Sequence, residues 1–306
     1  MGAGARMALG IQRMRWQTLA LAAAAFAVLA LPGPGLADGP AKPRRIASLN
    51  VCTDQLALLL GARDRLVSVT FLAADPSSSA LAAEARGLRL NRGRAEEIVP
   101  LAPDLVLAGD TAAAPGVQML GRLGFRIKVV PLARNLADIP RNIAILAHAI
   151  GEEARGRAMI ARFEEGLARV TQTHPAPGGH RPIALLIGPN GVTSGRDSLA
   201  GAIIETAGFA NGADGFGVLG VGRLPLERVL AARPDVLILS SLKVSHPSLA
   251  AGFIRHPALA AASAAATRVS IHHHVWACGT PLVLGAIERL AHLRATLGDG
   301  GKALRP

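Results

Sequence analysis

The residues best suited to chemistry are three consecutive histidines, His272-His273-His274, at the end of a predicted strand. Imidazoles bind transition metals, but a site for a bare ion needs ligands that converge from separate elements. Consecutive strand residues point to opposite faces, so these three side chains cannot converge by themselves. We therefore expect one of them to face a ligand cleft. His274 is the candidate that we choose, although the sequence does not decide which of the three faces the cleft.

Two cysteines, Cys52 and Cys278, are the only ones in the chain, and each closely follows a predicted strand. Three arrangements fit the sequence: a disulfide, two thiols that line a ligand pocket, and two buried small side chains. A disulfide requires Cα atoms within about 7 Å of each other, and spacing along the chain does not reveal that distance. Both cysteines are therefore candidate ligand contacts, and the three alternatives stay open.

Further candidates for ligand binding lie in loops that follow predicted strands. Phe71 and Trp276 could offer apolar area to a planar or bulky ligand. Arg92 and Arg223 could pair with carboxylates or catecholates of an anionic chelate, and Asn91 could supply hydrogen bonds. The alternative for each is ordinary packing or, for the arginines, a solvated side chain.

The first 37 residues are typical of a signal peptide. A basic start is followed by an apolar run of about 16 residues, which is short of the roughly 20 that a membrane span requires. A Pro- and Gly-rich stretch then leads to Ala37, where we expect cleavage. An uncleaved anchor is the alternative. We expect an exported protein that is soluble after cleavage.

Short predicted strands alternate with short predicted helices over residues 38–137 and again over 174–306. This alternation indicates a parallel sheet in each half. Residues 138–173 keep helical spacing without a strand and predict one connecting helix about 50 Å long, with Gly151 and Gly156 as weak points. We expect an α/β fold in which this long helix joins two Rossmann-like lobes, with a ligand cleft between them.

One motif occurs in both halves of the chain. Glu96 opens a predicted helix that leads to Pro103-Asp104 and a buried strand, and Glu227 opens one that leads to Pro234-Asp235 and another buried strand. A repeat of this kind predicts two lobes of similar construction.

The composition excludes several classes of protein. Of 306 residues, 50% are hydrophobic, which excludes a mainly disordered chain. Two cysteines exclude a Cys-rich metal array, and the absence of tyrosine excludes a tyrosinate ligand to haem. The formal net charge is +12, but no basic stripe with interleaved aromatics indicates nucleic-acid binding.

In order and spacing, these segments resemble the periplasmic substrate-binding proteins of ABC importers for ferric siderophores, haem and cobalamin. The resemblance covers essentially all of the chain after the leader, and around 193–198 the strand and turn pattern is most similar to the vitamin B12-binding members. The segments that carry it are 45–49 with 56–61, 66–70, 96–106, 193–198, 227–235, and Trp276 with 281–290.

The resemblance implies a periplasmic, monomeric binding protein without an intrinsic cofactor, which delivers a metal chelate to the permease dimer of an ABC transporter. It implies that Glu96 and Glu227 form salt bridges with permease arginines; the alternative is two solvated residues favoured by the helix dipole. Among ligands we expect a ferric siderophore first, because of the arginines. A corrinoid such as vitamin B12 comes next and haem third.

An exported enzyme, such as a metal-dependent hydrolase that uses the histidines, is the rival class. The chain lacks a His-Glu-x-x-His helix, a Gly-x-Ser-x-Gly elbow and a Gly-rich phosphate loop. We therefore expect no catalytic residues and no bare-ion metal site.

Overall fold

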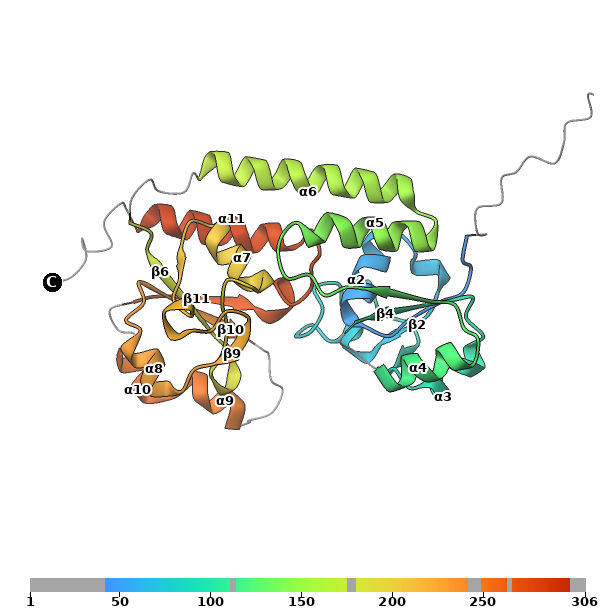
Figure 1. Cartoon of the computed structure of the whole chain (residues 1–306), viewed down its shortest axis with the longest axis horizontal. Helices are drawn as coiled ribbons and strands as arrows, with labels where there is room; N and C mark the ends of the chain where they lie inside the picture. The colour runs from blue at the N-terminus through green and yellow to red at the C-terminus, as the bar shows by residue number, and fades with distance from the viewer. Residues whose placement is uncertain (1–41, 111–113, 175–179, 242–248, 263–265, 298–306) are drawn as a thin grey trace, which may run out of the picture. The chain divides into compact units, whose positions relative to one another are not determined.

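A computed structural model describes residues 42–110, 114–174, 180–241, 249–262 and 266–297. The expected signal peptide, 1–37, lies outside the described residues. Lys42–Pro306 clusters as one compact unit, and within it the described strands and helices form two α/β lobes (Figure 1). No described helix is both long enough and apolar enough to cross a membrane.

The first lobe is built on a five-stranded sheet with the order β3-β2-β1-β4-β5, in which every pairing is parallel. Its strands are β1 (Ile46–Ser48), β2 (Leu66–Thr70), β3 (Leu90–Asn91), β4 (Leu105–Gly109) and β5 (Ile127–Val130). The helices that accompany them are α2 (Val51–Leu59), α3 (Ala95–Ile98) and α4 (Ala114–Arg122). The parallel sheet that strand–helix alternation predicts is thus present.

Both faces of this sheet are buried, because successive strand residues point to opposite sides. Leu105 and Leu107 of β4 belong to the cluster that α2 covers, whereas Val106 packs with Ile98 of α3 and Leu120 of α4. The strand is therefore apolar along its length.

The second lobe contains a four-stranded parallel sheet with the order β11-β10-β6-β8 and a separate two-stranded antiparallel sheet, β7–β9. The strands are β6 (Ile183–Ile187), β7 (Val192–Ser194), β8 (Ala210–Asn211), β9 (Val221–Arg223), β10 (Val236–Ser241) and β11 (Thr267–His272). The helices are α7 (Leu199–Thr206), α8 (Leu226–Ala231), α9 (Leu249–Ile254), α10 (Pro257–Ala262) and α11 (Val283–Thr296).

The repeated Pro-Asp motif has the same structural role in both lobes. Asp104 accepts hydrogen bonds from the backbone N–H groups of Arg44 (2.7 Å) and Arg45 (3.0 Å), just before β1. Asp235 accepts one from Ile183 (2.8 Å), at the start of β6. The residue before each proline is left-handed, with φ of 41° at Ala102 and 40° at Arg233. Each aspartate thus fastens the first strand of its lobe to a neighbouring strand.

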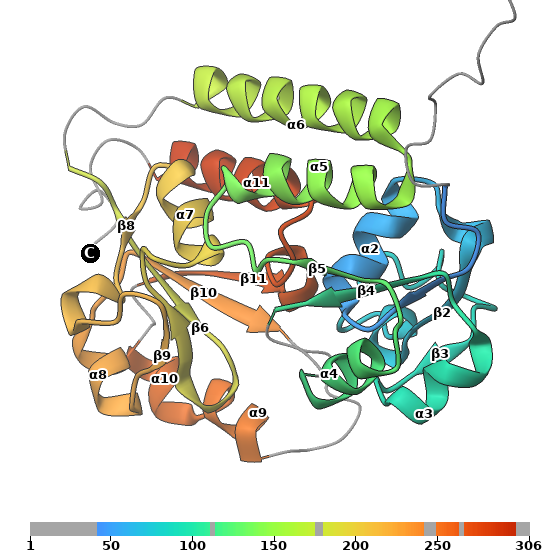
Figure 2. The same cartoon turned by 45° about the vertical axis from the view of Figure 1, so that its right-hand side comes forward.

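Residues 138–173 form two helices, where one was expected: α5 (Asp138–Ile150) and α6 (Glu153–Thr173). Gly151 ends α5 with a φ of 68°, a left-handed conformation that glycine adopts at little cost. The chain then reverses, and α6 lies beside α5 (Figures 1 and 2). Gly156 permits the close approach, since a Cβ there would lie 2.5 Å from Cβ of Ala147.

The helix α6 contacts elements of both lobes. It packs on α5 near its start, and at Gly166 it meets Leu284 of α11, where an added Cβ would lie 2.6 Å from the leucine side chain. Phe163 of α6, Ile143 of α5 and Leu290 of α11 belong to one continuous apolar cluster. That cluster extends into the sheets of both lobes, so the lobes share a core on this side.

Candidate ligand-binding site

A cavity of about 710 Å³ lies at the carboxyl end of β6. The sheet order changes direction at β6, since β10 and β8 flank it on opposite sides. Open α/β sheets bind ligands at such a switch point. Most of the wall comes from the turn after β6, the two-stranded sheet β7–β9, the start of α7 and the segment after β11. Leu132, Ala133 and Arg134 complete it from the first lobe.

Most of the wall is apolar. Leu186, Val192 and Leu199 contribute buried or half-buried side chains, and Val221 of β9 projects with 75% of its surface exposed. A mainly apolar cavity with a few polar groups is the usual construction of a site for a small organic molecule.

Trp276 is part of this wall and also part of the core. It is 4% exposed and follows the short 3₁₀-helix η6 (His273–Val275). The indole therefore combines two roles that the sequence left as alternatives: it is packed, and it lines the cavity.

Among the three histidines, His273 is the one that lines the cavity. The rings of His272 and His274 stack on each other instead, with centroids 5.3 Å apart and planes inclined by 14°. Partial desolvation, helped by the neighbouring charge of His274, lowers the pKa of His273. The choice of His274 as the cleft-facing histidine is therefore corrected to His273.

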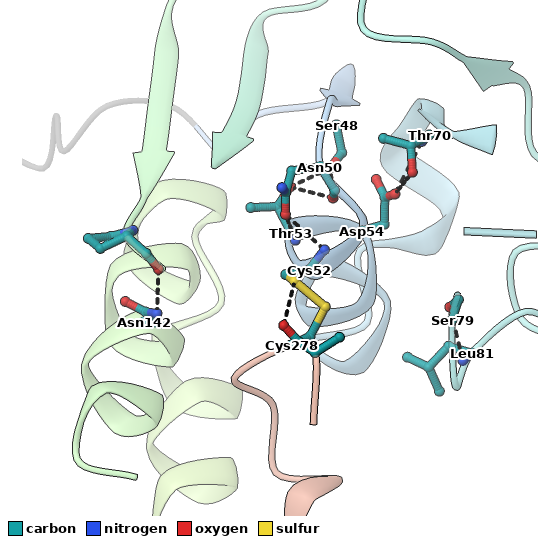
Figure 3. The surroundings of a disulfide bond; sticks show 12 residues. Ser48, Asn50, Cys52, Thr53, Asp54, Thr70, Ser79, Leu81, Asn142 and Cys278 are labelled. Carbon is teal, nitrogen blue, oxygen red and sulfur yellow. Dashed lines mark hydrogen bonds between the residues drawn. A yellow bond between two sulfur atoms is a disulfide. The ribbon is translucent and has the colours of Figure 1, made fainter. Parts of the chain in front are cut away.

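Cys52 and Cys278 form a disulfide, which decides between the three arrangements that the sequence left open. Asn50 caps α2 by accepting hydrogen bonds from the backbone N–H groups of Cys52 (2.9 Å) and Thr53 (3.4 Å), which places Cys52 in the first turn of the helix. Figure 3 shows the bond running from this turn to the segment that carries Cys278. That segment begins at the cavity wall with Trp276 and Ala277.

Two charged side chains of opposite sign complete the cavity, Arg134 from the first lobe and Asp197 from the second. The backbone N–H of Arg134 donates to Oδ2 of Asp138 at 2.9 Å. Within the described part of the chain, its guanidinium makes no hydrogen bond or ion pair. The cavity thus holds a cation that is available to an anionic group of a ligand.

The sequence matches the family described as periplasmic binding protein over residues 46–272. The chain belongs to this family. Cobalamin-binding proteins from two strains of Halobacterium salinarum are each 26% identical to this binding protein over 198 residues, 64% of this chain and 54% of theirs. The chain therefore spans about half the length of the curated relatives that it matches.

Solved structures share the fold of this binding protein. The apo form of the periplasmic heme-binding protein RhuT from Roseiflexus sp. RS-1 has a TM-score of 0.71 at 23% identity, over 83% of this chain and 98% of that one. A protein of an ABC-type Fe3+-hydroxamate transport system from Saccharomonospora viridis DSM 43017 has a TM-score of 0.62 at 23% identity, over 83% and 93%.

Phe71 and Arg92 of the binding protein meet outside the cavity wall. The guanidinium carbon of Arg92 lies 5.3 Å from the centroid of the Phe71 ring, a cation–π contact at the carboxyl ends of β2 and β3. Phe71 is 44% exposed. Sequence reasoning selected both residues but gave no sign that they contact each other.

Asn91 is placed inside the first lobe. It is 3% exposed, and its amide nitrogen donates to the carbonyl of Ser48 (3.0 Å) and to Oγ of Ser68 (2.7 Å). Its amide oxygen accepts from the backbone N–H of Gly93 at 2.9 Å. The side chain joins three adjacent segments of the lobe, and the structure gives it a structural position away from the cavity.

Arg223 is exposed on β9, two residues beyond Val221 of the wall. Glu96 and Glu227 are exposed in the first turns of α3 and α8. Among the described residues neither of these glutamates has a hydrogen bond or ion pair, whereas the adjacent Glu97 accepts from the backbone N–H of Arg92 at 2.7 Å. Glu96 and Glu227 thus hold equivalent, unpaired positions in the two lobes.

Sequence reasoning missed Arg134 and Val221 as cavity residues, and it did not single out His273 among the three histidines. It also missed Asp54, a fully buried carboxyl in the first turn of α2, two residues after Cys52. Its Oδ2 accepts from the backbone N–H (3.2 Å) and Oγ1 (2.5 Å) of Thr70. Burial raises its pKa to about 7, against the opposing effect of these hydrogen bonds. Alternation along the strand could have paired His272 with His274, but no local signal places 132–134 at the cavity.

Proposed function

We propose that this periplasmic binding protein captures a metal chelate in the cavity and delivers it, chemically unchanged, to the permease of an ABC transporter. The observation that carries the proposal is the cavity of about 710 Å³, to which both lobes contribute wall residues. Its volume lies within the range of roughly 300–1,000 Å³ that is usual for small-molecule sites.

Two cargo classes receive the most support. A corrinoid is supported by the curated relatives, which are named cobalamin-binding proteins. A ferric siderophore is supported by Arg134, whose guanidinium lies at the cavity without an ion pair among the described residues and suits carboxylate or catecholate groups. Haem is the alternative, supported by His273 in the wall, which can act as a nitrogen ligand in place of the absent tyrosine.

Delivery requires export and a docking surface. The basic and apolar leader over 1–37 supports export to the periplasm, where we propose that the mature protein acts as a monomer. Glu96 and Glu227 support docking, because each is exposed, unpaired among the described residues and equivalently placed in its lobe. In a permease with two-fold symmetry, an arginine of each subunit could form a salt bridge with the carboxylate on one lobe.

Titration of the purified mature protein tests the capture of a metal chelate. Cyanocobalamin, a ferric hydroxamate and haemin are added while the fluorescence of Trp276 is followed, since the only other tryptophan, Trp16, lies in the leader. Saturable binding of one chelate is expected. Failure of all three to saturate contradicts the proposal.

A pair of variants locates the binding. Val221→Glu places a charge on an exposed side chain of the cavity wall and is expected to weaken binding at least tenfold. Leu123→Glu is the matched control, because Leu123 is 55% exposed and lies outside the cavity wall. Equal affinities of the two variants contradict the assignment of the cavity.

A further inference from the structure

Asp197 lies in a turn between β7 and α7 whose backbone is held on both sides. Its N–H donates to the carbonyl of Leu219 (2.7 Å), and the N–H of Gly195 donates to the carbonyl of Gly220 (2.8 Å). The next residue, Ser198, caps α7 by accepting a hydrogen bond from a backbone N–H of the first turn. The side chain of Asp197, which lines the cavity, therefore extends from a backbone with a defined position.

The charged neighbour of Asp197 in the sequence does not neutralise it. The backbone N–H of Arg196 donates to Oδ1 of Asp214 at 3.1 Å, and its Nε lies 3.8 Å from Oδ2 of the same carboxylate. Within the described residues, the side chain of Asp197 has no hydrogen bond and no ion pair of its own. It is also the only carboxylate among the described residues that line the cavity. The second lobe thus presents one uncompensated negative charge to a ligand.

The first lobe presents one positive charge to the same cavity. Asp138 accepts a hydrogen bond from the backbone N–H of Arg134 (2.9 Å), but its carboxylate pairs with Arg141 at 3.3 Å. The guanidinium of Arg134 forms no ion pair with Asp197 or with any other carboxylate that the structure describes. The cavity therefore contains two separate charges of opposite sign, one from each lobe.

The connection between the lobes restrains the movement that would bring these two charges together. The disulfide joins the lobes beside the cavity. Ala133, which precedes Arg134, packs directly against Gly279, where an added Cβ would collide with the alanine side chain. A ligand with groups of both signs can reach both charged side chains without such a movement. Charge complementarity of this kind gives specificity, because a wrong ligand leaves one of the charges unpaired.

We propose that Asp197 binds a cationic arm of the captured chelate, and that the preferred cargo is a ferric chelate with an uncharged core, an ammonium arm and a carboxylate arm. The ammonium donates hydrogen bonds to the Asp197 carboxylate, and the carboxylate arm pairs with Arg134. Because most of the wall is apolar, an uncharged core suits the rest of the cavity. Cargo with negative charge alone, such as a tris-catecholate, would place an anion beside Asp197 and bind less tightly. The inference rests on the proposed capture of a metal chelate and narrows its cargo.

Three ferric hydroxamates with the same uncharged core test this assignment. Ferrioxamine G1 carries an ammonium at one end and a carboxylate at the other, ferrioxamine B carries the ammonium alone, and N-acetylferrioxamine B carries neither. Titrations of the disulfide-bonded protein, followed by the fluorescence of Trp276, give their dissociation constants. The affinity is expected to fall in this order, by about fivefold at each step, and the steps are expected to shrink at high salt.

Each step is expected to depend on one side chain. Asp197→Asn keeps the shape of the side chain and is expected to give ferrioxamine B the affinity of its acetylated form, which itself binds unchanged. Arg134→Gln is expected to remove the advantage of ferrioxamine G1 over ferrioxamine B, and an advantage that survives in this variant overturns the carboxylate arm of the cargo. Asp64→Asn is the matched control, because Asp64 is exposed and lies outside the cavity wall, and it is expected to keep both steps.

The outcomes distinguish this inference from the proposed function. Equal affinities for ferrioxamine B and its acetylated form, or a preference that survives in Asp197→Asn, overturn the role of Asp197 and leave the capture of chelates intact. An equal loss of affinity for all three compounds in Asp197→Asn also overturns it, because that result would mean a structural role. Failure of the hydroxamates to saturate, while cyanocobalamin or haemin does so, overturns the cargo and leaves capture intact. Absence of saturable binding by every chelate overturns both.

Discussion

Cys52 and Cys278, which are 226 residues apart in the sequence, are covalently bonded, with their Cα atoms 5.1 Å apart. The bond joins the first turn of α2 in the first lobe to a segment of the second lobe that carries Trp276 and Ala277 of the cavity wall. Gly279 continues this contact, because a Cβ there would collide with the Ala133 side chain. One wall of the cavity is therefore held against the opposite lobe by a covalent bond and by close packing.

Reduction of this disulfide is expected to lower both stability and ligand affinity. Without the bond the unfolded chain gains conformational entropy, because a long loop is no longer closed. Losses of about 2–4 kcal/mol in the free energy of unfolding are typical. The cavity wall also loses its anchor, so the dissociation constant is expected to rise. Urea unfolding and ligand titration, each with and without dithiothreitol, measure the two effects.

The variant Cys52→Ser/Cys278→Ser provides the control. The chain has no other cysteine. This variant is therefore expected to have the stability and ligand affinity of the reduced protein, and dithiothreitol is expected to change neither. An unchanged unfolding midpoint on reduction of the wild type would contradict a stabilising role of the bond.

Local patterns predicted much of the fold. The Pro-Asp repeats were identified because the same residue types recur in both halves, and both aspartates accept backbone hydrogen bonds at or just before the first strand of their lobe. Gly151 and Gly156 were both predicted as weak points of one long helix, but they look alike in the sequence, which did not show that the chain turns at the first of them. One ends a helix with positive φ, and the other lies inside a helix at a close contact with Ala147. Only the packing partner distinguishes them.

The wall of the cavity was harder to predict, because its residues come from segments that lie far apart in the sequence. Trp276 was chosen for its size and its place after a strand, and it is in the wall. Arg134 precedes α5 and meets the second lobe only because the chain reverses after Gly151. The direction of His273 depends on the end of β11 and the start of η6, a boundary that sequence patterns do not locate to one residue.

Charge reversal at Glu96 and Glu227 is expected to abolish uptake without affecting cargo binding. Both carboxylates are exposed, so the double variant Glu96→Arg/Glu227→Arg should fold, but it would present arginines to arginines at a permease. Uptake of the cargo by cells and affinity of the purified protein are measured in parallel.

The matched control for docking is Glu164→Arg/Glu165→Arg, which makes the same change in net charge on exposed residues of α6. This control is expected to support normal uptake. Equal uptake by the two double variants would remove the docking role of Glu96 and Glu227.

The buried carboxyl of Asp54 predicts a pH dependence of stability. Burial raises its pKa in the folded protein to about 7, from an ordinary value of 3.8. Between these values the folded chain holds a proton that the unfolded chain has lost. The free energy of unfolding therefore falls as pH rises through this window, by up to about 1.4 kcal/mol per pH unit from this group, and the fall ends above the folded pKa.

The variant Asp54→Asn tests this origin. Its amide oxygen can still accept from the backbone N–H and Oγ1 of Thr70, but it does not titrate. Urea unfolding between about pH 4 and 8 is expected to give a flatter profile for the variant than for the wild type. Identical slopes for the two proteins would assign the pH dependence to other groups.

The contact between α5 and α6 can be tested by adding one methyl group. In Gly156→Ala the new Cβ would lie 2.5 Å from Cβ of Ala147, so the helices must separate, at a cost of about 1–3 kcal/mol in the free energy of unfolding. Gly285→Ala in α11 adds the same group where no atom lies within 4 Å, and higher helix propensity is expected to raise stability by up to about 1 kcal/mol. Opposite shifts in the urea midpoint confirm that packing decides the first result. A stabilised Gly156→Ala variant would mean that α6 does not rest on α5 as closely as the structure shows.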